Sequence, residues 1–247
     1  MNAIKIDGIT KRFGNKTAVN HLSLEIREGE LFSLLGVNGA GKTTLIKMLT
    51  CLLKPNDGEA YILGKSVLTQ SSEVKELINL STQETAVAPN LTVRENLMMI
   101  AGIYGMDRET AKSRTAEMIE KLSFGEYENQ RAKTLSGGWQ RKLSIAMALI
   151  TQPKVLFLDE PTLGLDVLAR RELWELVRSL KGKMTIILTT HYMEEAESLS
   201  DRIGVMINSN LVTVGTPEEI MKNTDTQSIE DAFVKIAGGS SSAVNRE

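Results

Sequence analysis

The sequence has little of several features that mark other classes of protein. Cys51 is the single cysteine among 247 residues, so no intrachain disulfide can form, which fits a reducing compartment. The 29 basic residues nearly balance the 31 acidic ones, so no overall field draws the chain to nucleic acid or anionic lipid, although a local basic groove stays open. The strongest apolar runs, such as 31–37, are far too short to span a bilayer, and residues 1–5 lack the regions of a secretion signal. We therefore expect a chain that is soluble by itself.

The most informative stretch that is present is Gly-Val-Asn-Gly-Ala-Gly-Lys-Thr at 36–43, which matches the phosphate-binding loop pattern. Its glycines permit positive φ angles and a close approach to an anion, and the turned backbone points N–H groups inward. Lys42 can reach the outer phosphates and the Thr43 hydroxyl can ligate Mg²⁺. A glycine-rich turn with a chance lysine is the alternative, but an apolar strand precedes the loop and a helical pattern follows it. We predict a nucleoside triphosphate site formed by Gly36, Asn38, Gly39, Ala40, Gly41, Lys42, Thr43 and Thr44.

The order of apolar patterns predicts an α/β fold. Segments 4–6 and 22–26 alternate apolar and polar residues, as half-buried antiparallel strands do, whereas short apolar strands alternating with helices indicate a parallel sheet covered on both faces. Thr92 and Glu95 form a capping-box pattern at the start of a helical stretch. We predict a P-loop NTPase core with a mixed sheet, an antiparallel N-terminal β-subdomain and an inserted α-helical subdomain. The expected boundaries are one ATPase domain at 1–215 with its helical subdomain at about 84–150, a helical extension at 216–237, and a disordered Gly/Ser-rich tail at 238–247.

Two adjacent carboxylates follow the apolar strand at 155–158. A carboxylate at a strand end beside a phosphate loop is placed to anchor Mg²⁺, and we assign this role to Asp159. Glu160 follows immediately and, pointing elsewhere, could polarise the attacking water. Two surface carboxylates in a turn before Pro161 are the alternative.

Three further candidates are weaker when each is taken alone. Gln83 ends a predicted strand, where its amide could contact Mg²⁺ or the water, or could simply be polar surface. His191 follows the strand at 185–190 and could reach a γ-phosphate, or could be a satisfied edge residue. Ser136, Gly137 and Gly138 open a helix, which is either a second phosphate-binding terminus or an ordinary capped start.

Taken together in this order, these motifs and Leu165-Asp166 resemble the ATPase subunit of ATP-binding cassette (ABC) transporters from about residue 4 to 215. The resemblance implies ATP and Mg²⁺ as ligands, an adenine stacked on Phe13, and His191 as the γ-phosphate switch. It also implies that Ser136, Gly137 and Gly138 bind the ATP of a second subunit and that Asp166 lies in the loop linking the two sites. One departure is Trp139, which stands where the family usually has glutamine.

The chain has two phosphate-binding helix termini but one lysine and one acidic pair. A head-to-tail pair of chains would sandwich each ATP between the phosphate loop of one chain and the signature (Ser136, Gly137 and Gly138) of the other, an isologous dimer. We therefore expect a homodimer or a pseudo-symmetric heterodimer of cassettes.

The absence of several motifs excludes other classes of nucleotide-binding protein. No Asn-Lys-x-Asp guanine motif, coiled-coil heptads or zinc motif appears, and the chain has room for one cassette. We predict an ATPase whose hydrolysis drives transport through a separate integral membrane permease, with no nucleic acid partner, at the cytoplasmic face of the cell membrane. Segments 100–105, 189–197 and 228–233 resemble exporter ATPases of the drug, antibiotic-resistance and polysaccharide type. An importer ATPase, a soluble cassette acting on nucleic acid or ribosomes, and a monomeric P-loop kinase remain as alternatives.

The segment at 85–91 is the predicted docking site for the permease, because it is short-chained and apolar, unlike a free surface loop. Met98 and Met99 follow it on a helix, and methionine suits an adaptable groove for a partner helix. The alternative for the methionines is packing within the helical subdomain.

Overall fold

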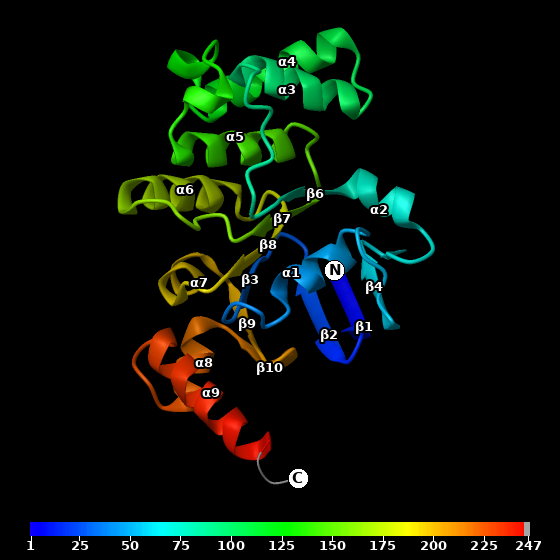
Figure 1. Cartoon of the computed structure of the whole chain (residues 1–247), viewed down its shortest axis with the longest axis vertical. Coiled ribbons are helices and arrows are strands. Elements are labelled where there is room, and N and C mark those ends of the chain that lie inside the picture. Colours follow the sequence, from blue (N-terminus) through cyan, green and yellow to red (C-terminus); the bar gives the residue numbers. More distant parts are fainter. Residues whose placement is uncertain (245–247) are drawn as a thin grey trace.

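A six-stranded mixed sheet forms the centre of the molecule in the computed structural model, which describes residues 1–244 (Figure 1). All neighbouring pairs are parallel except the edge pair β10–β9. The central strands are wholly buried, as expected for a sheet covered on both faces. Across the sheet the strands are β10 (Asn210–Gly215), β9 (Arg202–Ile207), β3 (Leu31–Leu35), β8 (Thr185–Thr190), β7 (Val155–Asp159) and β6 (Ile78–Ser81).

A second, antiparallel sheet is built from the N-terminal part of the chain. Its strands, in order, are β2 (Lys16–Arg27), β1 (Asn2–Phe13), β4 (Asp57–Ile62) and β5 (Lys65–Ser66). Helix α1 (Lys42–Leu49) contacts both sheets, and its Leu45 and Ile46 share one buried cluster with Ile4 of β1 and Phe157 of β7. The phosphate loop that precedes α1 is therefore held between the two sheets.

The opposite face of the central sheet packs against helices. Along β7, Val155 and Phe157 belong to the α1 cluster, whereas Leu156 and Leu158 pack with the helices of the other face. This alternation follows from the period of two in a strand. The elements on that side are α6 (Val167–Leu180) and α7 (Met193–Leu199). Helix α2 (Ser71–Leu77), which the sequence patterns did not predict, leads into β6.

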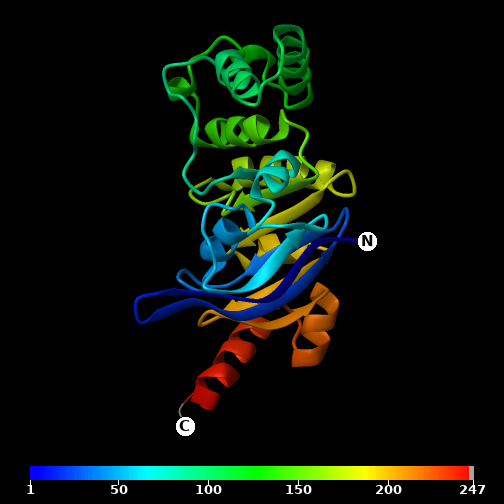
Figure 2. The ribbon, with the colours of Figure 1, turned by 90° about the vertical axis from the view of Figure 1, so that its right-hand side faces the viewer.

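A helical subdomain inserted between β6 and β7 lies at one end of the molecule (Figures 1 and 2). It contains α3 (Val93–Ile103), α4 (Arg108–Lys121) and α5 (Gly137–Leu149), with short 3₁₀ turns at Gly125–Tyr127 and Ala132–Thr134. The predicted capping box is present, because the Thr92 hydroxyl accepts from the Glu95 N–H at 3.1 Å and the Glu95 side chain reaches back to the Thr92 N–H at 2.8 Å. The predicted fold class is confirmed.

Helices α8 (Pro217–Thr224) and α9 (Ile229–Val244) lie at the other end of the molecule (Figure 1). The sequence predicted disorder from Gly238, but α9 continues to Val244, and residues 245–247 lie outside the described range. Ala232 and Phe233 anchor the first turns of α9 in a buried cluster with β9, and no proline interrupts the turns that follow. Among residues 1–244, no helix combines the length and the apolarity that a bilayer crossing needs.

Candidate functional site

The phosphate loop joins β3 to α1, and its glycines are required for two different reasons. Gly39 and Gly41 have φ angles of 85° and 108°, as predicted. At Gly41 an added Cβ would also lie 2.1 Å from the Ala18 carbonyl oxygen. Gly36 does not have a positive φ, which corrects the prediction; there a Cβ would lie 2.5 Å from the Met206 carbonyl oxygen. Close packing of the loop against neighbouring backbone therefore explains Gly36.

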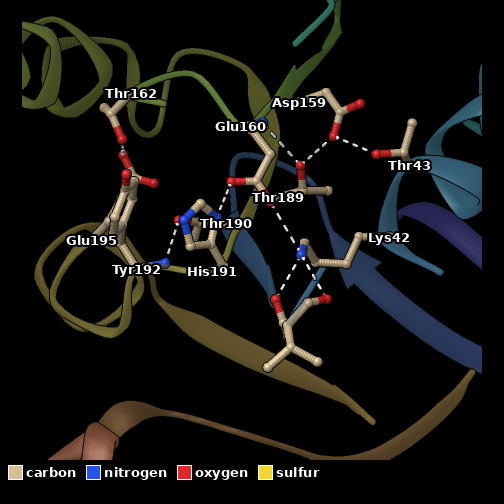
Figure 3. Close-up of polar contacts among 12 residues, drawn as sticks. Lys42, Thr43, Asp159, Glu160, Thr162, Thr189, Thr190, His191, Tyr192 and Glu195 are labelled. Carbon is tan, nitrogen blue, oxygen red and sulfur yellow. Dashed lines mark hydrogen bonds and ion pairs between the residues drawn. The ribbon is translucent and has the colours of Figure 1, made fainter. Parts of the chain in front are cut away.

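Lys42 is the first residue of α1, and its ammonium group is buried in the loop. Its Nζ donates to the carbonyl oxygens of Gly36 at 2.6 Å and Val37 at 3.3 Å, and lies 3.1 Å from Glu160 Oε1 (Figure 3). The Lys42 and Glu160 side chains are only 5% and 6% exposed. A buried cation beside the N–H groups of a helix N-terminus is an arrangement suited to anionic oxygen atoms.

Asp159 and Thr43 meet across the end of β7, as the sequence predicted. Asp159 Oδ1 accepts from Thr43 Oγ1 at 3.2 Å and from Thr189 Oγ1 at 2.5 Å (Figure 3). A carboxylate and a hydroxyl are the hard oxygen ligands that Mg²⁺ takes in proteins, and Mg²⁺ usually keeps waters and phosphate oxygens as its other ligands. The donor set of Thr43 and Asp159 therefore fits Mg²⁺.

Glu160 turns away from Asp159 because its backbone has a φ of 49°. Its N–H donates to the carbonyl and the hydroxyl oxygens of Thr189, at 3.1 and 3.0 Å, which holds this left-handed turn. The carboxylate then bridges Lys42 through Oε1 and His191 Nδ1 through Oε2 at 2.7 Å (Figure 3). Three of the predicted catalytic side chains are thus in one hydrogen-bonded and ionic network.

A cavity of about 370 Å³ opens over this network. Phe13 lies at its rim, where the β1–β2 hairpin ends, and its side chain is 51% exposed and available for stacking. Gln83 reaches the cavity from the exposed loop after β6. Lys16, a lining cation, was not among the predicted residues, although its place in a hairpin beside Phe13 could have indicated it. The full lining is Phe13, Lys16, Ala18, Asn38, Gly39, Ala40, Gly41, Lys42, Thr43, Thr44, Gln83 and Glu160.

The remaining predicted residues lie elsewhere in the chain. Ser136, Gly138 and Asp166 line a separate cavity of about 200 Å³ between α5 and α6, and Gly137 forms the first turn of α5 beside it. Ser136 caps α5 and Asp166 caps α6 through bonds from the backbone N–H groups. The phosphate loop and the Ser136 helix terminus of one chain therefore open into separate cavities, an arrangement that a site shared between two chains requires. Their binding to a second chain's nucleotide stays a prediction.

Trp139 packs into the helical subdomain. Its ring lies 4.3 Å from the ring of Tyr127 and 5.3 Å from that of Phe124, measured between centroids. Lys142 Nζ lies 4.4 Å from its centroid, a cation–π contact. The residue that departs from the family pattern thus has aromatic partners that the helical subdomain supplies.

Sequence reasoning missed three residues that organise the site. Thr189 connects Asp159 to the Glu160 backbone, and its position two residues before His191 at a strand end was a usable signal. Arg141 lies on the buried face of α5, and only its place shortly after Ser136-Gly137-Gly138 could have indicated it. Glu195 is fully buried, and its Oε1 accepts from Thr162 Oγ1 at 2.8 Å and from Trp174 Nε1 at 3.0 Å. The sequence alone does not distinguish Arg141 or Glu195 from charged residues on the exposed face of a helix.

Glu195→Gln is expected to change how stability depends on pH. Burial raises the pKa of the Glu195 carboxyl, against the hydrogen bonds from Thr162 and Trp174 that lower it. The stability from this raised pKa is complete below the ordinary value of 4.5 and is lost as the pH rises through the folded-state pKa. Glutamine does not titrate, so the melting temperature of the variant relative to the wild type should rise with pH. Thermal unfolding across that range measures it, with the exposed Glu197→Gln as control. A difference that is flat with pH would contradict the prediction.

Comparisons with known proteins agree with this geometry. The family model described as ABC transporter matches residues 19–163. Daunorubicin resistance ATP-binding protein DrrA3 of Streptomyces coeruleorubidus is 39% identical over 98% of this chain and 77% of that protein. Nod factor export ATP-binding protein I of Burkholderia orbicola (strain AU 1054) is 39% identical over 90% of this chain and 74% of that protein.

A solved relative shows the same fold in a nucleotide-bound state. The ATP-binding cassette MJ0796, a dimer in a post-hydrolysis state with ADP and Pi, aligns with a TM-score of 0.76 at 27% identity, over 86% of this chain and 98% of that one. The matched segment 19–163 contains the phosphate loop, the signature and the acidic strand end of this chain. The chain therefore belongs to the ABC transporter family and is one of its ATP-binding and ATP-hydrolysing cassettes.

Proposed function

We propose that this cassette powers an exporter, with each ATP sandwiched between two cassettes and the cargo carried by a separate membrane permease. The observation that carries the proposal is the separation of the two half-sites. The Lys42–Glu160–His191 network and the Ser136 terminus open into different cavities of one chain, so each is completed by a second cassette. The similarity to a drug-resistance protein and to a Nod factor export protein supports export over import.

In this proposal each site residue has a distinct part. Thr43 and Asp159 hold Mg²⁺, which when bound neutralises charge on the phosphate oxygens. Lys42 binds the outer phosphates, and Glu160 accepts the proton of the attacking water. His191 fixes the Glu160 carboxylate through Nδ1. Gln83 senses the ion or the water from the loop that leads into the helical subdomain.

The apolar surface for the permease is on α3. Met98 and Met99 are half-buried against the core of the helical subdomain, so the alternative considered for them, internal packing, holds. Ile103 and Tyr104, at the end of the same helix, are 69% and 48% exposed. Tyr104 also lines a small cavity with Ala86 of the loop after Gln83, which places this surface beside the Gln83 loop.

Ile103→Glu should uncouple export from hydrolysis. A buried charge in an apolar interface is costly, whereas an exposed glutamate on α3 leaves the nucleotide site intact. We expect loss of transport and of permease binding, with the ATPase activity of the isolated cassette unchanged. Val234→Glu is the matched control, because Val234 is 66% exposed on α9 at the other end of the molecule (Figure 1).

Purification of the tagged chain from membranes solubilised in mild detergent tests the proposed function directly. A multi-spanning protein should be recovered with the wild type and lost with Ile103→Glu. Recovery with ribosomes or DNA, or without any membrane protein, would overturn the transporter proposal. Inverted membrane vesicles given ATP outside distinguish export from import, because an exporter accumulates the cargo in their lumen and an importer does not.

A further inference from the structure

Arg141 is a buried cation whose described hydrogen bonds all go to backbone carbonyl groups. It lies in the second turn of α5 and is 4% exposed. Its Nε donates to the Pro161 oxygen at 2.7 Å and its Nη2 to the Asp159 oxygen at 2.8 Å. Its Nη1 donates to the oxygens of Gln83, at 3.2 Å, and Thr82. No carboxylate of the described residues forms an ion pair with it.

The four carbonyl groups belong to two segments that the site depends on. Thr82 and Gln83 follow β6 and begin the loop into the helical subdomain. Asp159 and Pro161 are the two sequence neighbours of Glu160, in the turn at the end of β7. Arg141 itself is carried by the helix whose first turn is the signature terminus. A single guanidinium thus joins the signature helix, the Gln83 loop and the turn that aims Glu160.

Attachment of α5 alone does not account for an arginine at this position. The Ser144 hydroxyl on the same helix already bonds the Ser81 hydroxyl of β6 at 3.0 Å. Burial of a guanidinium is unfavourable, and it lowers the pKa of Arg141 to about 10 even though Asp159, Glu195 and Glu160 oppose the shift. The group stays charged near neutral pH, and its planar fork serves several acceptors at fixed angles as no other side chain does.

We propose that Arg141 is a positioning residue that couples the signature helix and the Gln83 loop to the orientation of Glu160. Arg141 holds the backbone on both sides of Glu160 through the carbonyl groups of its two neighbours, and Thr189 accepts a hydrogen bond from the Glu160 N–H itself. A shift of the Gln83 loop when nucleotide binds is passed to α5 through the same guanidinium. The inference rests on ATP hydrolysis at this pocket and does not depend on export.

Arg141→Lys tests this role, because lysine keeps the charge but cannot span four carbonyl groups. The purified full chain should bind ATP with an unchanged Kd and hydrolyse it with a kcat lowered by about 10-fold or more, since a loss of orientation acts on the transition state. Arg114→Lys is the control, because Arg114 lies on α4 in a solvent-accessible ion pair with Glu117. Thermal unfolding identifies a variant that has lost its fold, in which case Arg141→Gln, which keeps a planar amide donor, replaces it.

The effect of ATP on amide hydrogen exchange distinguishes a positioning role of Arg141 from a purely structural one. In the wild type, ATP with Mg²⁺ should slow amide exchange in the phosphate loop, in the Gln83 loop and in the first turn of α5. In Arg141→Lys the phosphate loop should still respond, while the first turn of α5 should not. A folded variant with wild-type kcat, or with an unchanged ATP response at the signature turn, would overturn the proposal. If the wild type shows the expected kcat and the expected exchange response but exports nothing, the proposed function is contradicted and the role of Arg141 is not.

Discussion

Lys42→Ala should abolish ATP hydrolysis and severely weaken nucleotide binding. The Lys42 ammonium is the one cation buried at the base of the described phosphate cavity, and its three partners are two loop carbonyls and Glu160. Without it, the loop carbonyls and the Glu160 carboxylate face the phosphates with no compensating charge. Loss of one preorganised charge-stabilising group typically lowers kcat by about 10²–10³-fold, and here substrate binding falls as well.

The measurement is steady-state hydrolysis together with calorimetric binding of ATP and Mg²⁺. Lys47→Ala is the matched control, because Lys47 is an exposed lysine of the same helix and should retain both properties. Near-normal ATP hydrolysis by Lys42→Ala would contradict the assignment of this loop as the phosphate-binding site.

Local patterns were sufficient to predict most of this fold. The strands β3 (LFSLL) and β7 (VLFLD) are mostly apolar, and the helices carry caps such as Thr92 and Ser136 that are visible in the sequence. Such signals act within a few residues, so they do not require the tertiary structure to be known. The phosphate loop and the acidic pair at 159–160 are also short local motifs, and their function depends on local backbone geometry, since Gly41 and Glu160 both adopt positive φ angles.

What could not be predicted depends on contacts between distant segments. Gly36 is required by the Met206 carbonyl, which comes from the far end of the chain. Arg141 lies next to Lys142 on α5 and Glu195 next to Glu194 on α7, and only the packing of the two helices on the strand ends shows that Arg141 and Glu195 are buried. The tail after Gly238 was judged by composition, whereas the helix there continues from turns anchored by Phe233.

Glu160→Gln should retain ATP and lose hydrolysis. Glutamine has nearly the same shape and can still meet His191 and Lys42, but it cannot accept a proton from water. General-base assistance is worth about 10²–10⁴-fold in rate. Removing a negative charge from the base of the phosphate cavity also lessens the repulsion of the bound nucleotide, so affinity should be maintained or increased. Glu194→Gln, an exposed glutamate on α7, should hydrolyse ATP normally.

The same variant separates the two-chain site from a single-chain enzyme. Because ATP persists in Glu160→Gln, the interface that it forms between the phosphate cavity of one chain and the Ser136 and Asp166 cavity of another should persist as well. Light scattering after size-exclusion chromatography should show a dimer with ATP and Mg²⁺, and a monomer with ADP or with Lys42→Ala added to the variant. A monomeric P-loop kinase would remain a monomer under saturating ATP and would phosphorylate a second substrate. The separation of the two cavities in one chain favours the dimer, since neither cavity alone offers a nucleotide both the lysine and the signature terminus.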